Sequence, residues 1–151
     1  MTTVVNYNNT ILLNTSVDKV YKALTNEIPL WWTEMFEGSS DKQDVIFTVR
    51  FGDNVYKTMQ VQELNHHKVV WYVKNSLIAL PEFKNQTEWI GTTIVWEINE
   101  QEQNTKLILT HIGLNSEIEC YQVCSNGWKQ FIDSLKSYLE NGKGTPFLIQ
   151  N

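Results

Sequence analysis

His111 is the side chain in this sequence that could most readily do chemistry near neutral pH. It follows Leu107 and Leu109 at alternate positions, so a strand would place all three on one face. An imidazole on such an apolar face can orient a ligand carbonyl or act as a general base. The alternative is a buried, neutral histidine that hydrogen-bonds a neighbour and stabilises the fold, and we favour this interpretation.

Aromatic residues are the second group of candidates, because the sequence has six Trp, six Tyr and six Phe. Large rings either fill a core or line a pocket. We favour a ligand-accessible cavity over a fully packed core, with Trp128 at the boundary between a helix and the cavity. The candidate lining residues are Trp32, Phe47, Trp71, Trp96, Leu109, His111, Tyr121, Trp128 and Phe131.

Arg50 is the only arginine in the sequence, and its guanidinium could clamp a ligand carboxylate. We favour an ion pair with a carboxylate on a neighbouring strand. Cys120 and Cys124 lie four residues apart, and we expect one thiol packed in a helix and the other nearer the surface. No metal-ligand, nucleophile or phosphate-binding motif is visible, so we predict no metal, no cofactor and no catalytic residues.

Charge and composition exclude several classes of protein. The net charge is -5, and no cluster of Lys and Arg is available to follow phosphates, which excludes nucleic acid as a partner. No apolar run approaches the ~20 residues that a membrane-spanning helix needs, and the first ten residues have no signal-peptide pattern. Two cysteines fit a reducing compartment, so we expect a cytoplasmic protein with one domain over residues 1–151.

The hydrophobic pattern predicts an α+β domain. We expect strands at residues 4–13, 45–51, 56–64, 69–73, 87–99 and 105–112, a helix at 17–24, and a short helix that Pro29 opens. Apolar residues recur every three or four positions from about residue 117 to 141, just before Gly142, which indicates a long final helix. A helix laid across the concave face of a twisted antiparallel sheet leaves space for a pocket.

Several segments match a known family when they are taken together. They are VDKVYKALT (17–25) followed by Trp31 and Trp32, VQEL (61–64) ahead of KVVW (68–71), WIGTT (89–93), TKLILTHIGL (105–114), and GW (127–128) with Leu135, Tyr138, Leu139 and GKG (142–144). This set covers nearly the whole chain and resembles the activator-of-heat-shock-protein-90-ATPase homologue-like (AHSA-type) family of the START-like, birch-pollen-allergen-like superfamily (SRPBCC). The resemblance implies a helix-grip fold, in which a curved antiparallel sheet of about six or seven strands wraps around the C-terminal helix. It also implies a cavity that accepts hydrophobic ligands.

The function we expect is the binding of a small apolar or amphipathic molecule in that cavity, with His111, Tyr121 or Arg50 orienting it. One alternative is a protein-interaction module, with a chaperone or another protein as its partner, which the lineage of the family and the acidic net charge suggest. Another is a cyclase- or hydrolase-like enzyme that uses the same cavity with His111 as the base. Both a monomer and a homodimer fit the sequence.

Overall fold

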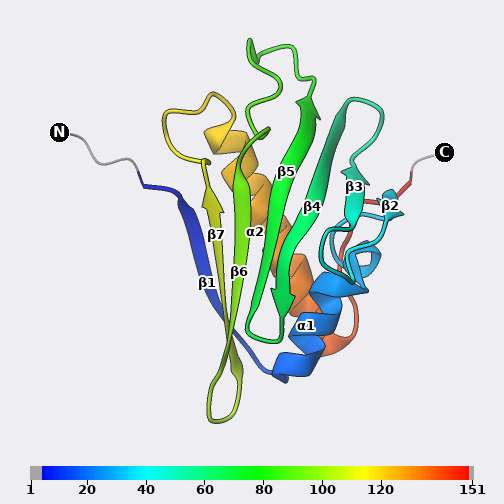
Figure 1. Cartoon of the computed structure of the whole chain (residues 1–151), viewed down its shortest axis with the longest axis vertical. Helices are drawn as coiled ribbons and strands as arrows, with labels where there is room; N and C mark the ends of the chain where they lie inside the picture. The colour runs from blue at the N-terminus through cyan, green and yellow to red at the C-terminus, as the bar shows by residue number, and fades with distance from the viewer. Residues whose placement is uncertain (1–4, 150–151) are drawn as a thin grey trace.

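The computed structural model describes residues 5–149, and its elements are shown in Figure 1. The strands are β1 (Tyr7–Leu13), β2 (Phe36–Gly38), β3 (Ile46–Arg50), β4 (Val55–Asn65), β5 (Lys68–Ile78), β6 (Thr93–Glu100) and β7 (Thr105–Ile112). The helices are α1 (Val17–Thr25), the short 3-10 helix η1 (Ile28–Leu30) and α2 (Tyr121–Asn141). Within the described residues, no helix is long and apolar enough to cross a membrane.

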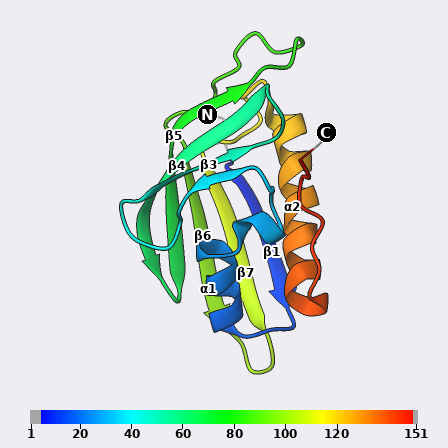
Figure 2. The ribbon, with the colours of Figure 1, turned by 90° about the vertical axis from the view of Figure 1, so that its right-hand side faces the viewer.

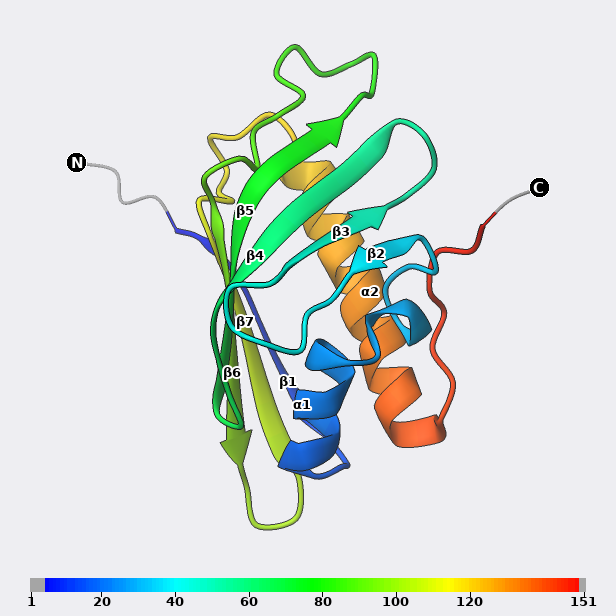
Figure 3. The same ribbon diagram turned by 45° about the vertical axis from the view of Figure 1, so that its right-hand side comes forward.

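The seven strands form one antiparallel sheet in the order β1-β7-β6-β5-β4-β3-β2. Strand β1 pairs with β7, so the first and last strands of the chain are neighbours, and Tyr7 lies opposite His111. The sheet curves, and α2 lies along its concave side (Figure 2). Helix α1 lies on the same side, next to α2 (Figure 3). A curved sheet around a C-terminal helix is the predicted helix-grip fold, which is thereby confirmed.

Two helix ends in the structure have clear capping residues. Ser16 caps α1, since its hydroxyl accepts a hydrogen bond from the backbone N–H of Lys19 at 3.3 Å. Gly142 ends α2 with a left-handed φ of 82°, and its N–H donates to the carbonyl of Tyr138. Each of these ends is thus stabilised by contacts within a few residues of the chain.

Other boundaries differ from the sequence-based prediction. The strand predicted from residue 87 begins only at Thr93, because hydrogen-bonded turns and Gly91, with a φ of 86°, occupy residues 87–92. Strand β5 continues to Ile78 instead of ending at Val73, because its polar second half pairs with the start of β4. Helix α2 starts at Tyr121, four residues later than predicted. Of the predicted first strand, residue 4 lies outside the described residues.

The core lies between the concave face of the sheet and α2. The buried residues of α2 include Cys124, Trp128, Phe131 and Leu135, all members of the predicted apolar stripe. Rings from the sheet and from the segment after η1 meet them, and the fully buried large side chains include Trp31, Trp71, Trp96 and Phe47. This aromatic layer forms the inner wall of the site described next.

Candidate functional site

A pocket of about 150 Å³ lies between α2 and the ends of β4 and β5. Its lining is mostly aromatic and aliphatic: Trp32, Phe51, Val55, Lys57, Ile78, Leu80, Trp89, Val123, Cys124, Gly127, Trp128 and Phe131. Val123 is 44% exposed, and Val55 and Leu80 are half-buried, so these three residues mark the side that opens to solvent. Trp32, Trp89 and Trp128 are buried and form the floor.

The residues from α2 reach the pocket because of their helical spacing. Val123, Gly127 and Phe131 are each four residues apart and therefore lie along one face of the helix. Gly127 leaves space at the centre of this face, since a Cβ built on it would have no neighbouring atom within 4 Å. Any larger side chain at this position would extend into the pocket.

The floor is a set of mutually packed rings. Trp128 lies 5.3 Å from Trp32 and 5.8 Å from Trp89, measured between ring centroids, and its stacking on Trp89 is nearly parallel. Phe51 and Phe131 pack at 5.5 Å and extend the aromatic surface toward the mouth. Rings held by several neighbours keep their orientation, so the pocket is shaped before any ligand arrives.

Lys57 is the only charged side chain among the residues that line the pocket within the described part of the chain. It is 8% exposed, and its Nζ lies 4.4 Å from the ring centroid of Trp89 and 4.9 Å from that of Phe51. No hydrogen bond or ion pair to this Nζ is found among residues 5–149. Burial lowers the pKa of Lys57 from 10.5 to about 8, although the nearby thiols of Cys124 and Cys120 act in the opposite direction.

Sequence reasoning missed Lys57, although a signal was present. It alternates with Met59 and Val61 in β4, and all three side chains are buried on the inner face of the sheet. A lysine at an inward position of an otherwise apolar strand face is rare, because an ammonium loses hydration there. The alternation of Lys57 with Met59 and Val61 within the predicted strand at residues 56–64 was the signal that could have identified it.

Cys120 and Cys124 lie beside the floor, and their sulfur atoms are 2.7 Å apart. Trp89 donates its indole N–H to Cys124 Sγ at 3.2 Å. The hydrogen bond between the thiols lowers the pKa of Cys124 and raises that of Cys120. The prediction that one thiol lies nearer the surface is wrong: both are buried, because the loop before β6 covers the start of α2, where Glu88 accepts a hydrogen bond from the N–H of Cys120.

His111 lies behind the pocket and is fully buried. Trp128 donates its indole N–H to His111 Nδ1 at 3.0 Å, which leaves the proton of the neutral ring on Nε2, facing Thr92 Oγ1 at 2.8 Å. The Thr92 hydroxyl in turn donates to the carbonyl of Trp89. Burial lowers the pKa of His111 to about 3. This chain of hydrogen bonds holds two tryptophans of the floor in place.

The other predicted site residues divide into three groups. Trp32, Trp128 and Phe131 line the pocket, as the sequence suggested. Tyr121 is half-buried outside the lining. The remaining candidates are buried in the core beneath the floor, namely Phe47, Trp71, Trp96 and Leu109. Alternation along a strand identifies inward residues, but it does not separate those that face the open space from those that fill the core.

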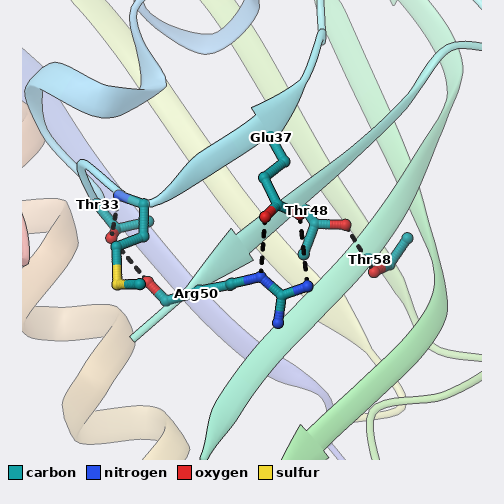
Figure 4. Close-up of polar contacts among 6 residues, drawn as sticks. Thr33, Glu37, Thr48, Arg50 and Thr58 are labelled. Carbon is teal, nitrogen blue, oxygen red and sulfur yellow. Dashed lines mark hydrogen bonds and ion pairs between the residues drawn. The ribbon is translucent and has the colours of Figure 1, made fainter. Parts of the chain in front are cut away.

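Arg50 does not line the pocket. It pairs with Glu37 of the adjacent strand β2, with its Nε 3.2 Å and its Nη2 3.4 Å from the two carboxylate oxygens (Figure 4). The same figure shows the neighbouring contact between the hydroxyls of Thr48 and Thr58, which joins β3 to β4. Arg50 thus forms the ion pair between neighbouring strands that we favoured. No group of three His, Cys, Asp or Glu side chains that could hold a metal is found in the described residues.

Comparisons with known proteins identify the family and the fold. The model of the family described as activator of Hsp90 ATPase homolog 1-like protein matches residues 14–140. The solution structure of the Aha1 dimer from Colwellia psychrerythraea is 28% identical in sequence, with a TM-score of 0.75, and the match covers 93% of this chain and 99% of that chain. No curated protein matches the sequence.

Two more distant structures share the fold alone. DynU16, a protein from the dynemicin biosynthetic locus, is 18% identical with a TM-score of 0.73, over 95% of this chain and 49% of that chain. Protein MLL2253 from Mesorhizobium loti is 14% identical with a TM-score of 0.69, over 88% of this chain and 96% of that chain.

Proposed function

Because this chain belongs to the family of activator of Hsp90 ATPase homolog 1-like proteins, we propose that it binds a small apolar or amphipathic molecule between α2 and the sheet. The fold of this family commonly binds ligands or proteins. The observation that carries the proposal is the pocket itself, in which three tryptophans and two phenylalanines surround space left open at Gly127. A packed core would fill that space.

The size of the pocket limits what it accepts. A cavity of about 150 Å³ lined by apolar side chains has room for about one benzene ring. Burial of one ring contributes about 2–3 kcal/mol, and contacts with the aromatic walls add about 1 kcal/mol. We therefore expect one-ring compounds to bind with Kd values of about 1–6 mM, and larger ligands to extend through the mouth at Val123.

Fluorine NMR with one-ring fluorinated aromatics tests the proposal, because line broadening detects weak binding. The blocking variant is Gly127→Leu, whose side chain enters the pocket without meeting neighbouring atoms at Cβ. The matched control is Gln122→Leu, which adds a leucine at an exposed position of the same helix. We expect broadening with the wild type and with Gln122→Leu, and its loss with Gly127→Leu. No broadening at about 10 mM probe, or equal broadening with Gly127→Leu, would overturn the proposal.

Self-association is a second candidate function, and one observation favours it. The Colwellia psychrerythraea Aha1, 28% identical, is described as a dimer. In the present chain β1 lies at one end of the sheet, and its outer edge is a surface on which a second copy could pair. Sedimentation velocity over a range of protein concentrations tests this: a dimer that dissociates on dilution supports it, and a monomer throughout refutes it.

The enzyme alternative receives less support from the geometry. It relied on His111 as the base, and this imidazole is shielded from the pocket by Trp128 and engaged at both nitrogens. A base must come within hydrogen-bond reach of the proton that it removes. For His111 to act as a base, Trp128 would first have to move aside, whereas ligand binding in the pocket requires no movement of Trp128.

A further inference from the structure

Lys57 lacks a partner of opposite charge in the pocket. The residue is 8% exposed, and its Nζ lies over the rings of Trp89 and Phe51. Among the described residues, no carboxylate reaches this Nζ. A buried ammonium without a counter-ion is costly, and proteins ordinarily pair such a charge. The thiols of Cys124 and Cys120 interact with this charge, but no carboxylate of the described residues does, so a bound acid could supply the missing counter-ion.

We infer that Lys57 anchors an acidic head group, so that the pocket selects small aromatic monocarboxylates or similar monoanions over neutral molecules of the same shape. The inference rests on the proposed function and names the ligand class for the same pocket. The aromatic walls would hold the ring, and the ammonium would hold the acid. The rings of Trp89 and Phe51 already lie against the ammonium in the free state, so a ligand anion would meet a group that is held in place.

The number of positively charged side chains in the pocket determines which ligand charge fits best. Lys57 supplies one positive charge, and the other lining residues are apolar or aromatic apart from the thiol of Cys124 and the backbone at Gly127. A dianion such as a phosphate monoester would keep one charge unpaired in the pocket, which is unfavourable. A cationic ligand would gain from the aromatic faces but would be repelled by the ammonium. An aromatic monoanion can pack its ring against the aromatic walls and pair its single charge with Lys57.

Paired probes isolate the contribution of the charge. We would compare 4-fluorobenzoate with 4-fluorobenzamide, which has almost the same shape and no charge, by fluorine NMR titration. The test variant is Lys57→Met, which keeps the length of the side chain, and Lys57→Gln provides a second neutral side chain in case the first variant does not fold. Lys74→Met is the matched control, since it removes the same charge from an exposed position on β5.

We expect the wild type and Lys74→Met to bind the benzoate more tightly than the benzamide. In Lys57→Met the benzoate should lose about 10-fold or more in affinity, as a charge-assisted hydrogen bond implies, while the benzamide changes by less than about 3-fold. If the benzamide binds and Gly127→Leu abolishes its binding, but the benzoate has no advantage in the wild type, the role of Lys57 is refuted and the pocket stands. If neither probe binds the wild type, the proposed function itself fails.

Discussion

Replacing Lys57 by methionine should make the protein more stable at neutral pH, although it removes a buried contact. The folded state lowers the pKa of Lys57 from 10.5 to about 8, with desolvation as the main cause. Folding therefore disfavours the charged lysine, and the wild type carries this cost at every pH below about 8. Methionine has similar length and needs no hydration, so it fits the same space without the cost.

The magnitude follows from the pKa. A change from 10.5 to about 8 corresponds to about 3 kcal/mol at neutral pH. The faces of Trp89 and Phe51 stabilise the ammonium, and their loss offsets about 1 kcal/mol of the gain. We therefore expect Lys57→Met to raise the free energy of unfolding by about 2 kcal/mol near pH 6.5.

The pH dependence distinguishes this explanation from a simple packing effect. Between about pH 8 and 10.5 the unfolded chain binds more protons at Lys57 than the folded chain, so the stability of the wild type rises with pH in this window. The advantage of the variant should accordingly shrink by about 2 kcal/mol between about pH 6.5 and 9.5. Urea unfolding of both proteins at the two pH values measures it. A variant that is less stable than the wild type by the same amount at both values would refute the reasoning.

Three further changes have defined outcomes in the same urea assay. His111→Ala should cost about 3 kcal/mol, because it leaves a hole and a buried indole N–H of Trp128 without its acceptor; a loss below about 1 kcal/mol would contradict this role. In the wild type, the stability that depends on neutral His111 should decline as the pH falls from 6.5 toward about 3, since the unfolded chain takes up the proton first, and His111→Ala should lack this component. Arg50→Gln should cost less than about 1 kcal/mol, because the side chains of Arg50 and Glu37 are 37% and 61% exposed, and a larger loss would show a stronger pair. Gly127→Ala should add about 1 kcal/mol through helix propensity, as its Cβ meets no atom within 4 Å, whereas destabilisation would mean that the space is not open.

Periodic features of this protein were predictable from the sequence alone. The stripe of Cys124, Trp128, Phe131 and Leu135 predicted α2, and Gly142 predicted where this helix ends. These features depend on neighbours within a few residues, whose spacing the chain itself records. The resemblance to the family, which the match over residues 14–140 confirms, joined these elements into the helix-grip fold.

Tertiary structure decided which inward side chains face open space. Trp32 lines the pocket, whereas Trp71, stacked on it at 5.9 Å, belongs to the core. No pattern along one strand separates the two, because the difference is set by where α2 and the loop before β6 meet the sheet. The position of a residue in a strand specifies the face of the sheet on which its side chain lies. Whether that side chain lines a pocket or is buried in the core depends on elements far away in the chain.

Tertiary structure also decided the chemistry of the ionisable groups. His111 was the most conspicuous candidate in the sequence, yet Trp128 and Thr92 engage both of its nitrogens behind the floor. Lys57 was not among the candidates from the sequence, yet the rings of Trp89 and Phe51 lie against its ammonium in the pocket. The charge state of a side chain depends on the water and the partners around it. For Lys57 these come from β4, the segments after β3 and before β6, and α2, which only folding brings together.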